Sequence, residues 1–136
     1  MRQDTRTELL RQVEAQRDDM ERMVRIATGN ADDEIEGDWE WLRDNGADIP
    51  EQADDDEMIE AGQNMIDESL LESYGVYHGR PDDLRYQGCV VVVHLGGPHV
   101  ELQTETRTWH GYWAGNTVVL SASRDVCEYF DAMFEG

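Results

Sequence analysis

The sequence predicts an α+β protein in which N-terminal helices precede a four-stranded antiparallel meander and a C-terminal helix that packs on one face of the sheet. Apolar residues recur at the spacing of amphipathic helices within residues 5–73. They change to β-branched, alternating runs within residues 86–121, and a helical pattern returns over residues 123–135. We expect all 136 residues to form one domain, since a chain of this length buries roughly two-thirds of its unfolded surface in a single core.

The first two helices are predicted from capping and periodicity. Thr5 and Glu8 form a capping-box pattern that opens a helix over about residues 5–28. A second helix is predicted over about residues 32–45, with Gly46 as its C-terminal stop. Its apolar face consists of Ile35, Trp39 and Leu42.

A third helix is predicted from Asp54 or Asp55, either of which can cap it, to about Ser73. Gly62 weakens its centre by up to about 1 kcal/mol relative to alanine, so we expect tertiary packing to hold this helix. Residues 74–83 are rich in Gly, Tyr, Pro and Asp, a composition that predicts a connecting loop.

Four strands and a last helix follow. The segment from Cys89 to Leu95 is apolar on both faces, as in a central strand, and the next strand alternates with Val100 and Leu102 inward. The predicted strands cover residues 89–95, 99–104, 107–113 and 117–121. Ser121 or Ser123 then caps the last helix, whose inward face contains Val126, Cys127 and Phe130. We interpret Cys89 and Cys127 as reduced core thiols, because they form neither a secreted disulfide framework nor a Cys-x-x-Cys motif.

The composition limits the possible ligands. The chain has 31 acidic residues against 11 arginines and no lysine, for a formal net charge of -20. Nucleic acid is excluded as a direct ligand, because affinity for it comes mainly from neutralising phosphates with Lys and Arg. An anionic membrane surface is disfavoured for the same reason, and no apolar run reaches the length of a membrane span. With no apolar signal segment at the N-terminus, we expect a cytoplasmic protein.

The acidic residues are concentrated in the middle of the chain. Residues 28–83 contain 19 acids and two arginines, whereas residues 1–27 are balanced and residues 84–136 contain six acids and three arginines. Adaptation to high salt predicts acidity along the whole surface, whereas a partner-binding surface predicts this concentration. On a helix, carboxylates such as Glu36, Glu40 and Asp44 repeat every ~5–6 Å, a spacing close to that of nucleic-acid phosphates. The candidate partner-binding residues are Asp32, Asp33, Glu34, Glu36, Asp38, Glu40, Trp41, Asp44, Asp48, Asp54, Asp55, Asp56, Glu57, Glu60, Asp67 and Glu68, with Trp41 as an aromatic anchor.

No pattern indicates an enzyme or a cofactor. The chain contains no Gly-x-Ser-x-Gly and no P-loop. His94, His99 and His110 could converge on neighbouring strands near Cys89 and form a zinc site. No His-Glu-x-x-His or paired Cys spacing supports such a site. Hydrogen-bonded strand histidines are therefore the preferred interpretation. The calcium-like segment that begins at Asp32 has an arginine at its twelfth position and is rejected. We therefore predict no catalytic residue, no metal and no cofactor.

A small acidic chain with runs such as Asp54-Asp55-Asp56-Glu57 resembles the phage- and plasmid-encoded inhibitors of host DNA-directed defence, the anti-CRISPR and antirestriction proteins of DNA-mimic type. The resemblance is one of size, charge and clustering over the whole chain. It implies a non-enzymatic inhibitor in the host cytoplasm that occupies a basic DNA- or RNA-binding channel of a CRISPR effector or of a restriction enzyme. The alternative is a small haloarchaeal protein whose acidity is an adaptation to salt, and monomer and homodimer both stay open.

Overall fold

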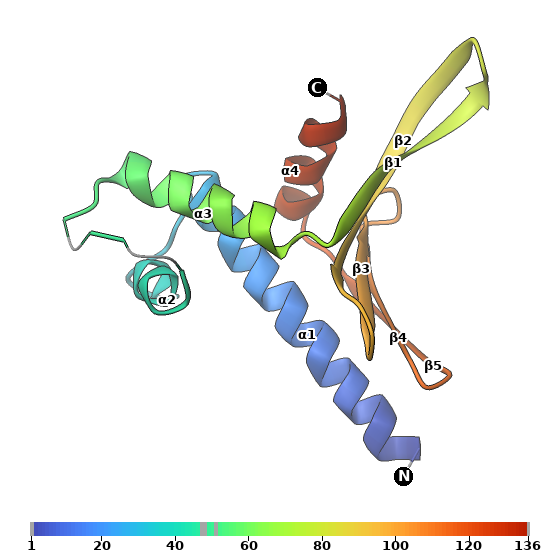
Figure 1. The fold of residues 1–136 in the computed structure, drawn as a ribbon, viewed down its shortest axis with the longest axis horizontal. Coiled ribbons are helices and arrows are strands. Elements are labelled where there is room, and N and C mark those ends of the chain that lie inside the picture. Colours follow the sequence, from blue (N-terminus) through green and yellow to red (C-terminus); the bar gives the residue numbers. More distant parts are fainter. Residues whose placement is uncertain (1, 47–48, 51, 136) are drawn as a thin grey trace. The chain divides into compact units, whose positions relative to one another are not determined.

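The computed structural model describes residues 2–46, 49–50 and 52–135. Within these residues the chain forms four helices and a five-stranded antiparallel sheet, which confirms the α+β class (Figure 1). The helices are α1 (Arg2–Ala27), α2 (Asp38–Asn45), α3 (Asp55–Ser69) and α4 (Arg124–Glu135). The strands are β1 (Glu72–Arg80), β2 (Asp83–His94), β3 (His99–Gln103), β4 (Thr108–Trp113) and β5 (Asn116–Ser121). Asp48, one of the predicted contact residues, lies outside the described residues.

The chain divides into two compact units. We call Met1–Asp18 with Leu70–Gly136 the sheet unit, and Asp19–Ser69 the helical unit. By sequence, α1 contributes its first part to the sheet unit and the part from Asp19 onward to the helical unit. Among the described helices, none combines the length and the apolar character that crossing a bilayer requires.

The sheet unit is a meander with its core on one face. Its strands lie in the order β1-β2-β3-β4-β5, and all neighbours are antiparallel. Leu102 is paired with Val91 on one side and with Trp109 on the other, so these three fully buried side chains share a face. Val13 of α1 packs against Gly111 on that face, where a side chain larger than hydrogen would clash. The inward orientation of Val100 and Leu102 is confirmed, since neither is accessible to solvent.

The C-terminal helix α4 covers the same face of the sheet, beside β2. Ser123 caps α4, because its Oγ accepts the backbone N–H of Val126 at 3.1 Å. Val126, Cys127 and Phe130 are buried, as predicted. Cys89 and Cys127 are both buried and form no disulfide, in agreement with their assignment as reduced core thiols.

The prediction of a connecting loop over residues 74–83 is wrong, because strand β1 occupies most of this segment. Strand β1 pairs with β2 along its length, with a register shift between Val76 and Tyr77, and a short turn between Arg80 and Asp83 joins the two strands. The segment lacks an apolar alternation because β1 is an edge strand with no fully buried residue. Tyr77 and Tyr86 stabilise the hairpin through an edge-to-face contact with ring centroids 5.6 Å apart. The meander therefore has five strands instead of four.

The second helix is shorter than predicted. It begins at Asp38, because Gly37 adopts the left-handed conformation (φ 62°) that ends any helix arriving from residue 32. Asp32 instead forms a turn in which its Oδ1 accepts the N–H of Ile35 at 3.0 Å. Ile35 is therefore 83% exposed, and its predicted place on the apolar face is wrong. Leu42 is fully buried, as predicted.

The core of the helical unit is a cluster of Ile26, Leu42 and Met58 from its three helices. Trp39 and Trp41 are both half-buried against this cluster, although they are two residues apart on α2. The partly buried residues around it are Ala31, Trp39, Trp41, Ile49, Ala53, Ala61 and Met65.

Helix α3 begins as predicted and ends early. Asp54 is its cap, because its Oδ1 accepts the N–H of Glu57 at 2.8 Å. The helix ends at Ser69 instead of Ser73, since β1 starts at Glu72. Gly62 is buried where α3 approaches α1. A methyl group on it would lie 2.7 Å from Cγ2 of Ile26 and 3.1 Å from the backbone nitrogen of Ala27.

Replacing Gly62 by alanine is therefore expected to destabilise the protein. The gain in helix propensity is about 1 kcal/mol, whereas overpacking against α1 costs about 1–3 kcal/mol. Urea unfolding measures the difference, and Asn64→Ala, an exposed change on the same helix, is the control that improves propensity without a clash. A Gly62→Ala variant more stable than the native protein would show that the two helices are not closely packed at this point.

Candidate functional site

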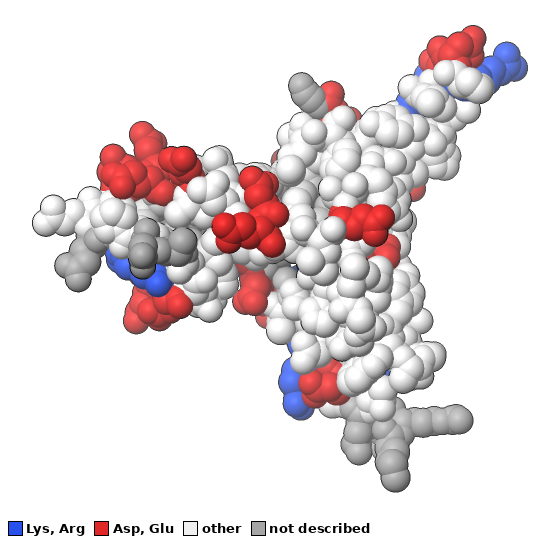
Figure 2. Space-filling view, in the orientation of Figure 1, with Lys and Arg blue, Asp and Glu red and all other residues white. Residues whose placement is uncertain are grey.

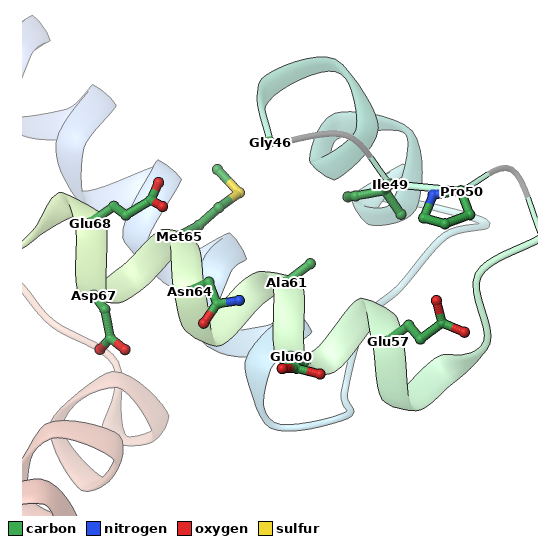
Figure 3. A pocket seen from close by; sticks show the side chains of 10 residues that line it. All are labelled: Gly46, Ile49, Pro50, Glu57, Glu60, Ala61, Asn64, Met65, Asp67 and Glu68. Atoms are coloured by element: carbon green, nitrogen blue, oxygen red, sulfur yellow. The ribbon is translucent and has the colours of Figure 1, made fainter.

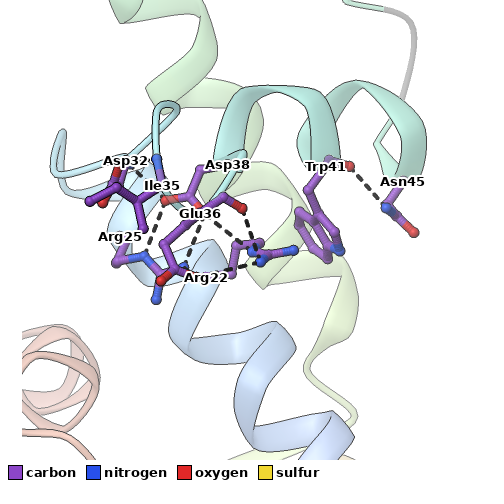
Figure 4. A network of polar contacts seen from close by, with 8 residues as sticks. All are labelled: Arg22, Arg25, Asp32, Ile35, Glu36, Asp38, Trp41 and Asn45. Carbon is purple, nitrogen blue, oxygen red and sulfur yellow. Dashed lines mark hydrogen bonds and ion pairs between the residues drawn. The ribbon is translucent and has the colours of Figure 1, made fainter.

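The acidic helical unit is organised around one buried carboxylate, that of Asp38. Its side chain is inaccessible to solvent, and Arg25 of α1 binds both of its oxygens, with Nε to Oδ2 at 3.1 Å and Nη2 to Oδ1 at 3.0 Å (Figure 4). Nε of Arg22 lies 3.2 Å from Oδ1, and the backbone N–H of Asp32 donates to Oδ2 at 2.8 Å. Two cations and one amide therefore satisfy this carboxylate. Although Asp38 was predicted to contact a partner, its buried side chain joins α2 to α1.

These contacts set the ionisation of the pair. Burial by itself would raise the pKa of Asp38, but the hydrogen bonds from Arg25 and from the Asp32 N–H outweigh it and hold that pKa below its usual value. The hydrogen bond with Asp38 raises the pKa of Arg25 further above its already high value. Asp38 is therefore ionised throughout the neutral range.

Arg22 links the buried pair to the aromatic ring of Trp41. Its guanidinium lies 5.5 Å from the centroid of that ring, a cation–π contact, and its Nη2 donates to the backbone oxygen of Glu36 at 3.2 Å (Figure 4). Glu36 also approaches Arg22 and Arg25 with its carboxylate, at 3.9 and 4.0 Å. Trp41, predicted to be a partly exposed anchor, is half-buried, and the guanidinium of Arg22 already lies over its ring.

Most of the other acidic side chains that the structure describes in the helical unit face solvent. The unit contains 18 acidic residues and three arginines, a net charge of -15, whereas the sheet unit contains 13 and eight, a net charge of -5. Figure 2 shows Asp and Glu side chains gathered over α3, while the visible surface of the sheet is mostly uncharged. Ten of the predicted contact residues are exposed and form no ion pair within the described part of the chain. They are Asp33, Glu34, Glu40, Asp44, Asp55, Asp56, Glu57, Glu60, Asp67 and Glu68.

Three other predicted contact residues have structural roles. Asp32 forms the turn before α2, Asp54 caps α3, and Glu36 lies beside the arginine pair. Because α2 begins at Asp38, the predicted carboxylate repeat through Glu36 is broken. The two carboxylates that do repeat on α2 are those of Glu40 and Asp44.

A hollow lies on α3 within this unit. It has a volume of about 410 Å³, and Ala61 and Met65 project from α3 toward Ile49 and Pro50 across it (Figure 3). Glu57 and Glu68 lie at its two ends (Figure 3). Its lining residues are Gly46, Ile49, Pro50, Glu57, Glu60, Ala61, Asn64, Met65, Asp67 and Glu68. Sequence reasoning identified the carboxylates but not the apolar floor, because the floor forms only when Ile49 and Pro50 pack beside α3.

The strand histidines do not converge. Nδ1 of His94 is 2.6 Å from the backbone oxygen of Pro98, Nε2 of His99 is 2.7 Å from Oε1 of Glu101, and Nε2 of His110 is 2.7 Å from Oγ1 of Thr108. Within the described residues, no group of three His, Cys, Asp or Glu side chains has an arrangement that can hold a metal ion. The preferred interpretation, hydrogen-bonded strand histidines, is confirmed.

A second buried polar group lies in the sheet unit around Asp131. Tyr86 and Thr104 donate hydrogen bonds to its Oδ1 at 2.6 and 2.7 Å, and Thr104 Oγ1 accepts the backbone N–H of Cys89 at 2.7 Å. Burial raises the pKa of the Cys89 thiol, and burial followed by the bond to Asp131 raises that of Tyr86. A thiol that keeps its proton is a poor nucleophile, so Cys89 is not activated for chemistry. The hydrogen bonds to Asp131 join α4 to the sheet.

Comparison with known proteins gives no relative: no family model, no curated protein and no solved structure matches this chain.

Asp38→Asn is expected to destabilise the protein by about 3 kcal/mol, because it leaves two arginines around a neutral amide. Asp44→Asn removes the same charge from an exposed position of α2 and is expected to have no effect or to stabilise slightly, since it reduces like-charge repulsion. Urea unfolding of both variants at neutral pH measures the contrast. Equal effects would show that the buried pair does not stabilise α2.

The stability difference between the native protein and Asp38→Asn is also expected to depend on pH. Because the pKa of Asp38 is lower in the folded than in the unfolded protein, its ionised form stabilises the fold above the unfolded pKa of about 3.9. That contribution is lost as the pH falls through the lower, folded pKa. We therefore expect the free energy of unfolding of the native protein to exceed that of Asp38→Asn at pH 6, and this difference to be smaller at pH 3. A constant difference would mean that the charge of Asp38 is not the stabilising element.

Proposed function

We propose that this protein is a non-enzymatic inhibitor whose helical unit binds a strongly basic, nucleic-acid-binding surface of another protein. The supporting observation is the segregation of charge, with a net charge of -15 in the 51 residues of the helical unit and ten exposed carboxylates that no arginine neutralises within the described residues. A CRISPR effector is the first partner to test and a restriction enzyme the second, because both hold nucleic acid in a basic channel.

The inhibition would act by occupation of the channel. A partner channel lined by Lys and Arg attracts the acidic surface over a distance set by screening, about 10 Å at 0.1 M salt. Nucleic acid and this protein would then compete for the same cations. Such binding needs no catalytic group, no metal and no cofactor on this chain.

Salt adaptation explains the distribution of charge less well. It predicts acidity over the whole surface, yet the sheet unit has eight arginines against 13 acids over more residues than the helical unit. On α3, the first-turn acids Asp55, Asp56 and Glu57 lie at the positive end of the helix dipole, which stabilises them. Asp67 and Glu68 lie in the last turn, where the dipole disfavours a carboxylate and a cationic partner would relieve that cost.

The test is binding to a panel of purified CRISPR effectors and restriction enzymes at 0.1 M and 0.5 M salt, with and without competing DNA. We expect binding that DNA displaces and that weakens at the higher salt. Neutralising Asp55, Asp56 and Glu60 to Asn, Asn and Gln should weaken binding at 0.1 M salt by about tenfold, if each exposed pair contributes about 0.5 kcal/mol. Asp54 stays unchanged because it caps α3.

The matched control neutralises three exposed acids of the sheet unit, Glu72, Asp82 and Glu105. It has the same net charge as the first variant and is expected to bind almost as well as the native protein. If both variants lost the same affinity for the partner, binding would depend on the net charge of the protein alone. That result would contradict a specific acidic surface on the helical unit. A protein that binds nothing and folds only in molar salt would favour the haloarchaeal alternative.

A further inference from the structure

The hollow on α3 combines two chemical features that a simple acidic face lacks. Its floor is apolar, formed by Ala61 and Met65 of α3 and by Ile49 and Pro50 of the segment that precedes it (Figure 3). Its ends are charged, with Glu57 at one end and Glu68 at the other (Figure 3). The hollow thus offers apolar contact between two carboxylates.

The charge of the lining defines the kind of ligand. Four of the ten lining residues are acidic, and none of the ten is basic. The carboxylates of Glu57, Glu60, Asp67 and Glu68 form no ion pair with any described residue. An anionic or purely apolar ligand would leave these charges repelled or desolvated, whereas a cationic ligand with an apolar part satisfies both features.

The spacing of the two end carboxylates sets the length of the ligand. Glu57 and Glu68 are eleven residues apart on α3, which corresponds to about 16 Å along the helix axis. Side chains of an extended chain alternate between its two faces and advance about 3.3 Å per residue, so two side chains four positions apart point to the same side and lie about 13 Å apart, a distance that long side chains extend to about 16 Å. Arginine fits both ends, because its guanidinium pairs with carboxylates while its aliphatic stem lies on apolar surface.

We infer that the hollow on α3 is a docking site for an extended protein segment in which two arginines four positions apart flank an apolar side chain at the position midway between them. The apolar side chain lies over Ala61 and Met65, and the arginines pair with Glu57 and Glu68. This inference rests on the proposed function, since it names the part of the basic partner that the acidic surface holds.

The probe is an octapeptide with arginine at positions two and six, leucine at position four, and glycine or serine elsewhere. It is titrated into the full-length ¹⁵N-labelled protein at 0.1 M salt, and the amide shifts give both the dissociation constant and the location. We expect the largest shifts at Ala61, Asn64 and Met65. Replacing the leucine of the peptide by serine should weaken binding about fivefold, because the apolar contact is lost.

The paired variants are Glu57→Gln/Glu68→Gln and Glu40→Gln/Asp44→Asn. Both remove two exposed charges, the first from the ends of the hollow and the second from α2, outside the lining. The first should weaken peptide binding about fivefold, since two exposed ion pairs are lost, and the second less than twofold. Both double variants change only exposed side chains, so the spectrum of each should keep the native pattern.

The outcomes separate this inference from the proposed function. Equal effects of the two double variants, no effect of the leucine replacement, or shifts centred on α2 would overturn the docking site, even where the protein binds a CRISPR effector or a restriction enzyme. Peptide binding in the hollow by a protein that binds no member of the panel would sustain the docking site and count against the proposed target.

Discussion

The helical unit depends on the pairing of Asp38 with Arg22 and Arg25. Helix α2 has eight residues, too few to be stable by itself, so its position must come from tertiary contacts. Leu42 supplies the apolar contact and Asp38 the polar one. Two of the three arginines in the unit are committed to this buried carboxylate and to the neighbouring Glu36. The same pairing that fixes α2 therefore occupies these two arginines, and the ten exposed carboxylates named above form no ion pair among the described residues.

How far the sequence predicts this fold depends on whether an element has a buried face. Helix α1 and strands β2 to β5 were predicted because buried apolar residues recur in them at a regular period. Strand β1 was missed because it pairs along one edge only and buries no side chain fully, so its sequence shows no alternation. The start of α2 was misplaced because it depends on the left-handed conformation of Gly37 and on a side-chain turn at Asp32. The spacing of apolar residues along the sequence gives no information about such backbone conformations and turns.

The candidate site shows the same division. The excess of acidic residues in the middle of the chain could be counted from the sequence, and the structure places that excess in a separate compact unit. Composition does not distinguish the internal carboxylate of Asp38 or the capping carboxylate of Asp54 from the solvent-exposed ones. That distinction needs tertiary partners, namely two arginines in one case and a helix N-terminus in the other. The hollow also was not predictable, because its floor joins residues 49 and 50 to positions of α3 that are more than ten residues away.

Repulsion among the exposed carboxylates and attraction to a basic partner have the same physical origin. In the free protein, like charges on α2 and α3 oppose the compact state of the helical unit, and each adjacent pair costs about 0.2–0.5 kcal/mol at low salt. A cationic surface placed against these helices neutralises the charges and removes that cost, in addition to forming its own ion pairs. A ligand that binds only the folded state stabilises it. Under the proposed function, covering the helical unit with a basic surface would therefore stabilise its fold as well as block the target channel.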